Sequence, residues 1–233
     1  HFTDVLFESI RNFSITEEEA LARFIVLNPE VLKPYVDSNR SVLIVGGHYN
    51  NWEMVAVGID RYLQHRAVAI YHQLGNKFLD AKVLSSRSKF GLKLIPRPEV
   101  KAFFAETKEL TATIFGVDQS PSIAKKVYWC DFLNQDTPVM FGAEKFAIKK
   151  DYPVVFGEIT KVKRGYYTFK LEVLFDEPTK CTYGEITEGH TKRLEKQILL
   201  APQYWLWTHK RWKRKRNAEE MLEKENKMKK NQF

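Results

Sequence analysis

Short, almost entirely apolar runs alternate along this chain with longer segments of mixed apolar and polar residues. This pattern predicts strands that alternate with helices. Short apolar runs bounded by Gly or polar residues indicate buried strands, which we expect at Ser41 to Gly47, Arg66 to His72, Leu92 to Pro96 and Leu110 to Val117. The mixed segments between them indicate helices, expected at about Asn51 to Leu63, Asn76 to Phe90 and Glu99 to Lys108. This order predicts an α/β fold, a layered sheet with flanking helices.

Both ends of the chain continue the pattern. Ser14 and Glu17 are spaced as a capping box, which predicts a helix through Glu18, Ala22 and Phe24. Further elements are expected in the second half: a helix at Gly142 to Lys150, strands at Pro153 to Val162 and Tyr166 to Phe175, and a helix at Glu185 to Leu200. Lys163-Arg164-Gly165 separates the two strands and predicts a hairpin with Gly at the turn position.

His48 and Glu53 follow the first strong strand, and an imidazole and a carboxylate at this spacing suggest a catalytic base with its orienting acid. Five positions of a regular helix turn by about 140°, so the two side chains face each other only at a strand-to-helix junction. A neutral imidazole is available near pH 7 to take a proton from a hydroxyl, and a carboxylate fixes its tautomer. The competing interpretation is that His48 caps a helix and Glu53 is a solvated acid of its first turn.

The residues around this pair suit such a junction. Gly46 and Gly47 supply backbone freedom for a tight exit from the strand. Asn50 or Asn51 can cap the helix that follows. We therefore expect His48 in the turn, facing Glu53.

Composition favours one globular domain without a metal centre. The chain has 233 residues, of which 44% are hydrophobic, enough to bury a sizeable core. Its two cysteines, Cys130 and Cys181, form no disulfide framework, and no Cys/His cluster has zinc-ligand spacing. The apolar runs are too short to span a bilayer.

Positive charge is concentrated at the carboxyl end. Residues 209–233 hold ten Lys or Arg and four Glu, a net +6 of the chain's +8. Together with Trp207 and Trp212, this block suits an anionic membrane surface. A solvated, partly helical tail is the alternative. A nucleic-acid partner is not expected, because no basic and aromatic pattern of a nucleic-acid fold accompanies the charge.

Further motifs follow His48 to Glu53 in a fixed order: Asn76, Arg87, Gly91, Gly116-Val117-Asp118-Gln119, Pro138-Val139-Met140-Phe141-Gly142 and Pro202-Gln203-Tyr204-Trp205-Leu206-Trp207-Thr208-His209-Lys210-Arg211-Trp212. This succession resembles the lipid A late acyltransferases, the lauroyl and myristoyl transferases of the lysophospholipid and glycerolipid acyltransferase superfamily. The superfamily has a His-x4-Asp/Glu motif after its first core strand. The resemblance implies an acyltransferase domain at residues 1–213 and leaves a basic charged tail at residues 214–233 without a counterpart.

The resemblance implies a glycerolipid-acyltransferase-like fold and transfer of a fatty acyl group from acyl carrier protein, or from coenzyme A, to a hydroxyl of a membrane lipid. A lipid A precursor is the leading acceptor. No metal or redox cofactor is implied. The resemblance implies a location at the cytoplasmic face of the inner membrane, with a membrane-anchoring segment ahead of His1. The departure from the family is Asn50-Asn51, where it often has Gly-Asn.

Five residues are expected to carry the reaction. His48 is the general base and Glu53 its orienting carboxylate. Arg87 is expected to hold an oxyanion or a lipid phosphate, with a surface ion pair as the alternative. Asp118 is expected to hold Arg87 or the acceptor, or simply to cap the turn after its strand. Asn76 is expected to position substrate.

Two other functions remain open at this stage. The same motifs occur in relatives that acylate mannosylated phosphoinositides or amino-acid-containing lipids. A non-catalytic lipid-binding or acyl-carrier-binding protein would also retain the fold.

Overall fold

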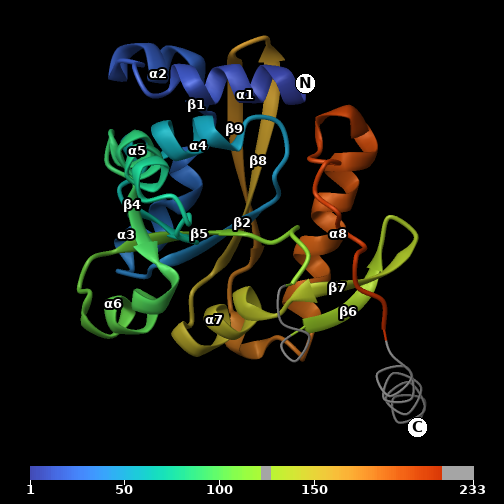
Figure 1. Ribbon diagram of the computed structural model, residues 1–233. Coiled ribbons are helices and arrows are strands. Elements are labelled where there is room, and N and C mark those ends of the chain that lie inside the picture. The colour runs from blue at the N-terminus through green and yellow to red at the C-terminus, as the bar shows by residue number, and fades with distance from the viewer. Residues whose placement is uncertain (122–126, 217–233) are drawn as a thin grey trace, which may run out of the picture.

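A seven-stranded sheet forms the centre of the computed structural model, which describes residues 1–121 and 127–216 (Figure 1). Its strand order is β1-β9-β8-β2-β5-β3-β4. The strands are β1 (Phe24–Val26), β2 (Val42–Gly46), β3 (Arg66–Tyr71), β4 (Lys93–Pro96), β5 (Thr111–Gly116), β8 (Val154–Lys163) and β9 (Tyr166–Phe175). All neighbouring strands are parallel except β8 and β9, which form an antiparallel hairpin. The predicted α/β class is confirmed.

The middle strand is β2, which pairs with β5 on one side and β8 on the other. Its residues Val42 to Val45 are at most 1% exposed. Such a continuous run of Val, Leu and Ile is typical of a parallel strand with both faces covered. Pairing with β5 and β8 sets the direction and the register of the strand, and these position the residues that follow Gly46.

Helices cover the sheet and its ends: α1 (Phe2–Arg11), α2 (Glu17–Arg23), α3 (Lys33–Asp37), α4 (Trp52–Gly58), α5 (Lys77–Ser88), α6 (Val100–Glu106), α7 (Gly142–Lys150) and α8 (Glu185–Leu200). In Figure 1, α5 and α6 lie to one side of the central strands and α8 to the other, while α1 crosses the end of the sheet beside the β8–β9 hairpin. Within the described residues, no helix combines the length and apolarity needed to cross a bilayer.

The amino-terminal helix prediction was wrong in its cap and its end. Thr16, not Ser14, caps α2, because its extended backbone lets its hydroxyl accept the Glu19 N–H at 3.2 Å. Ser14 instead donates its hydroxyl to the carbonyl of Arg11. Phe24 lies in β1, where Phe-Ile-Val pairs in parallel with β9, so burial against the sheet ended the helix at Arg23.

A hairpin between β6 (Val127–Phe132) and β7 (Gln135–Met140) was not predicted. Its two turn residues, Leu133 and Asn134, both have positive φ, as a type I′ turn requires. Arg216 lies against this hairpin, where it makes two hydrogen bonds to Asp136 and stacks over Trp129. Residues 217–233 of the expected tail lie outside the described residues.

Gly157 in β8 is packed so closely by its neighbours that a side chain at this position has no room. A Cβ there would lie 2.3 Å from the Phe169 ring and 3.2 Å from Ile44. We expect Gly157→Ala to lower the free energy of unfolding by about 1–3 kcal/mol, since overpacking a buried site forces its neighbours to move. Urea denaturation followed by circular dichroism measures this.

Gly142→Ala is the matched control, because nothing lies within 4 Å of a Cβ at Gly142. Its effect should stay within about 0.5 kcal/mol. Equal effects of the two substitutions would contradict the packing described around Gly157.

Candidate active site

His48 and Asp118 lie together because β2 and β5 are paired in register. Gly46 is opposite Gly116 at the ends of these parallel strands, and each of the two side chains follows two residues later. His48 Nδ1 lies 2.7 Å from Asp118 Oδ1, and the His48 backbone N–H donates to Asp118 Oδ2 at 2.8 Å. Two contacts to one carboxylate hold both the backbone and the ring of His48.

Gly116 leaves room for this ring. A Cβ on Gly116 would lie 3.0 Å from His48 Cε1, so a larger residue would press on the imidazole. The Trp52 ring meets the imidazole edge to face, with 5.1 Å between centroids. The second ring nitrogen, Nε2, lies 3.4 Å from the Gln119 amide nitrogen. With Asp118 accepting the Nδ1 proton, Nε2 carries the lone pair that can accept a proton.

The carboxyl-terminal segment, residues 201–216, closes one side of this site. Trp205 donates its indole N–H to Asp118 Oδ2 at 2.9 Å. The Leu206 N–H donates to the His48 carbonyl, and the Asn50 N–H donates to the Tyr204 carbonyl. From the sequence we expected Trp207, Trp212 and the basic residues of this segment to meet an anionic membrane surface, and we expected no role for Trp205. Its aromatic residues resemble ordinary core, so no local signal pointed to a contact with Asp118.

Charges and burial act in opposite directions on the pKa values of the pair. Burial favours neutral His48, but the charge and hydrogen bond of Asp118 outweigh it and raise the pKa of His48 above its usual 6.5. Burial also opposes charge on Asp118, yet the His48 charge and the hydrogen bonds from His48 and Trp205 lower the pKa of Asp118. Each partner thus favours the charged form of the other.

The turn between β2 and α4 has the expected features. Asn50 adopts φ of 52°, a left-handed conformation that Asn tolerates, and its amide donates to the Ile159 carbonyl. Asn51 caps α4 by accepting the Glu53 N–H at 3.1 Å. The expected strand-to-helix junction at His48 is therefore present.

Glu53 lies in the first turn of α4 and pairs with Arg87 of α5. Arg87 Nε donates to Oε2 at 2.8 Å and its NH2 to Oε1 at 2.5 Å, a fork that uses both carboxylate oxygens. From the sequence we expected Glu53 to orient the His48 ring. In the structure Asp118 makes that hydrogen bond, because α4 directs Glu53 toward α5, and Glu53 acts on His48 only through its charge.

Asn76 lies on the exposed surface and caps α5. Its side chain accepts the N–H groups of Phe78 and Leu79. It therefore does not line the site, but it fixes the start of the helix that carries Arg87.

A cavity of about 190 Å³ lies between the sheet and helices α4 and α5. His48, Glu53 and Arg87 form its polar part, whereas Ile44, Ile114 and Leu94 are among the apolar residues of its wall. Apolar walls with a few convergent polar groups are typical of a small-molecule site. In the part of the chain that the structure describes, no three His, Cys, Asp or Glu side chains form a group that could hold a metal ion.

Comparison with known proteins yields one family. The family model for bacterial lipid A biosynthesis acyltransferases matches residues 1–214, which include His48, Glu53, Arg87, Asp118 and Trp205. No curated protein matches the chain.

The two carboxylates near His48 should differ in their effect on its pKa. We expect Asp118→Asn to lower the pKa of His48 markedly, because it removes both the adjacent charge and the charged hydrogen bond. Glu53→Gln should lower it less, since no hydrogen bond joins the two side chains. Titration of the imidazole by NMR checks both variants. A larger drop in Glu53→Gln would contradict the pairing of His48 with Asp118.

Proposed function

Because this chain belongs to the bacterial lipid A biosynthesis acyltransferase family, we propose that it moves a fatty acyl group from an acyl thioester to a hydroxyl of a lipid A precursor, with His48 as general base. Membership of the family makes it an acyltransferase. The donor, the acceptor and the roles of single residues are the proposed part. The observation that carries the proposal is the His48–Asp118 pair at the polar end of an apolar cavity.

The reaction begins when His48 Nε2 takes the proton of the acceptor hydroxyl. The hydroxyl oxygen attacks the thioester carbonyl, a C–O bond forms and the C–S bond breaks. The proton held by His48 then passes to the departing thiolate. Asp118 accepts from Nδ1 throughout, so it fixes the tautomer and stabilises the imidazolium. Trp205 keeps Asp118 in place through its indole N–H.

Arg87 is the proposed electrostatic partner of the reaction. Two of its five N–H donors bind Glu53, and the remaining donors are available for the oxyanion or for a phosphate of a substrate. Glu53 thus acts as a positioning residue for Arg87. Asn76 has an indirect role, since it caps the helix on which Arg87 lies.

The proposed donor is acyl carrier protein loaded with a fatty acid, with coenzyme A as the second candidate, and no metal or redox cofactor takes part. The proposed location is the cytoplasmic face of the inner membrane. In support of a lipid surface, α1 exposes about half of each of Phe2, Leu6 and Ile10, which recur every four residues along one stripe. A helix with such a stripe lies favourably in a membrane interface.

Replacement of the base should abolish transfer. We expect His48→Ala to lower turnover by a factor on the order of 10² or more, the usual loss when a positioned general base is removed. Mass spectrometry of the lipid products formed from fatty-acyl-loaded acyl carrier protein and purified lipid A precursor measures this.

His72→Ala is the matched control, since His72 is exposed and outside the cavity. Near-normal turnover in His48→Ala would refute the mechanism. Product with phosphoinositide mannosides or amino-acid-containing lipids, and none with the lipid A precursor, would change the acceptor while leaving the chemistry in place.

The pH dependence of transfer follows from the raised pKa of His48. The base is active when neutral, so kcat/KM should rise with pH through a midpoint above 6.5. In Asp118→Asn the midpoint should move to lower pH while the plateau falls, because the imidazole loses the charge that favoured its proton and the group that fixed its tautomer. Rate profiles between pH 5 and 9, in steps of about half a unit, test this. An unmoved midpoint would exclude His48 as its source.

A further inference from the structure

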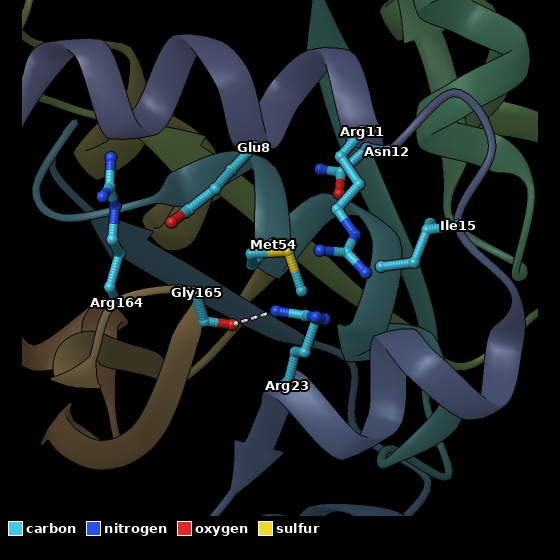
Figure 2. Close-up of a pocket in the computed structure, with 8 residues that line it drawn as sticks. All are labelled: Glu8, Arg11, Asn12, Ile15, Arg23, Met54, Arg164 and Gly165. Atoms are coloured by element: carbon cyan, nitrogen blue, oxygen red, sulfur yellow. Dashed lines mark hydrogen bonds between the residues drawn. The ribbon is translucent and has the colours of Figure 1, made fainter.

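A second cavity, of about 260 Å³, lies between α1, α2 and the turn of the β8–β9 hairpin (Figure 2). In contrast to the apolar cavity, its wall is rich in cations: Arg11, Arg23 and Arg164. Figure 2 shows the Arg11 and Arg23 guanidinium groups on neighbouring sides of it and Glu8 across from them. The roles described so far use none of these residues.

Positive charge exceeds negative charge around this cavity. The cations are the three arginines together with Lys89 and Lys161, whereas the acids in contact with them or in the wall are Asp4, Glu8 and Glu19. Five cations against three acids leave a net charge of +2. Arg11 and Arg23 share the single carboxylate of Glu19. Since a guanidinium group has five N–H donors, this sharing leaves donors for an anion.

Asn12 supplies an unpartnered donor at the same place. Its side chain is buried at 3% exposure, it lines the cavity, and its Nδ2 has no hydrogen-bond partner. Buried polar groups are nearly always hydrogen-bonded, so a lone amide donor in a cavity wall suggests a missing ligand. Arg and Asn donors together suit a phosphate group.

Glu8 supplies a hydrogen-bond acceptor, and Gly165 supplies space, for a neutral polar part of the ligand. Asn51 and the Tyr167 hydroxyl both donate to Glu8 Oε2, at 2.6 and 2.7 Å, which fixes the carboxylate and leaves Oε1 toward Gly165. A carboxylate oxygen accepts from sugar hydroxyl groups. Gly165 has φ of 77°, and a Cβ there would lie 2.8 Å from the Arg23 guanidinium, so this position keeps the cavity open.

Helix α4 separates this cavity from the apolar one. Met54 lines the cation-rich cavity, whereas Trp52, Glu53 and Val55 line the cavity that holds His48. An α-helix with its side chains is about 10–12 Å across. A lipid with a sugar head group is long enough to reach across α4 from one cavity to the other. The same Asn51 that caps α4 also binds Glu8.

We propose that the cation-rich cavity binds a phosphorylated sugar, the head group of the acceptor lipid. Its volume lies just below the range of drug-sized pockets and suits one sugar with one phosphate. This inference rests on the proposed function, because it names the part of the acceptor that the enzyme holds while a hydroxyl reaches His48. Helix α1 lines this cavity with Glu8 and Arg11, and its exposed apolar stripe of Phe2, Leu6 and Ile10 would then face the lipid surface that carries this head group.

Calorimetry with the full chain and glucosamine 1-phosphate tests binding without any transfer reaction. The parent protein should bind it at least tenfold more tightly than glucosamine or inorganic phosphate. Arg23→Gln and Asn12→Asp should each weaken binding by about tenfold or more, the first by removing donors and the second by adding a repelling charge. Arg61→Gln, which breaks the exposed Arg61–Glu17 pair near α2 and lies outside the cavity, should bind as the parent does.

Thermal unfolding identifies any variant that fails to fold, and Asn12→Asp keeps the side-chain shape if Arg23→Gln unfolds. Absence of binding by the parent, or equal binding by parent and folded cavity variants, would overturn the proposal. Equal affinity for inorganic phosphate would overturn the sugar part of it.

Steady-state kinetics then assign the ligand to the acceptor or to the donor. In Arg23→Gln the KM for the lipid acceptor should rise about tenfold, with the KM for the acyl donor unchanged. A rise for the donor alone would assign the cavity to the donor's phosphate and overturn the proposal. Binding by a parent that transfers no acyl group would refute the proposed function and leave the sugar-phosphate site standing, so the two failures are distinguishable.

Discussion

The parallel pairing of β2 with β5 is the constraint on which the site depends. Their register aligns Gly46 with Gly116, so His48 and Asp118 leave the sheet side by side, each two residues past its strand. The pairing itself is held by the almost complete burial of β2 between two neighbours. A one-residue slip would turn every side chain of β2 to the opposite face and would shift His48 away from Asp118. The distance between His48 and Asp118 is thus set by the packing of the whole sheet rather than by a local loop.

Much of the architecture could be predicted from the sequence, because the signals for it are local. The apolar run Val42 to Val45, the glycines after it and the caps at Asn51 and Asn76 each specify structure within a few residues. His48 was placed correctly at a strand-to-helix junction for this reason. β1 was missed because its formation depends on a remote partner, β9, whereas the β6–β7 hairpin was missed although its two strands are adjacent along the chain.

The partner of His48 could not be predicted, since it depends on which strand lies beside β2. That strand is β5, which comes about 70 residues later, and β3 and β4 intervene along the chain. Sequence spacing favoured Glu53, whose side chain follows α4 toward Arg87 instead. The contribution of Trp205 was hidden for the same reason, because a tryptophan in an aromatic-rich segment gives no sign of which carboxylate its N–H will meet.

The hydrogen bonds from the carboxyl-terminal segment to Asp118 and to the His48 backbone also have a bearing on biosynthesis. β2 and β5 are translated well before this segment, so the nascent chain lacks the Trp205 donor for Asp118 and the Leu206 donor for the His48 carbonyl until both residues have been made. Until then the buried Asp118 carboxylate would lack one hydrogen-bond donor, and the turn at His48 would lack its hydrogen bond from Leu206. A polypeptide that ends before Trp205 therefore lacks the hydrogen bonds that hold Asp118 and the His48 turn, so the site is complete only after this segment has been translated.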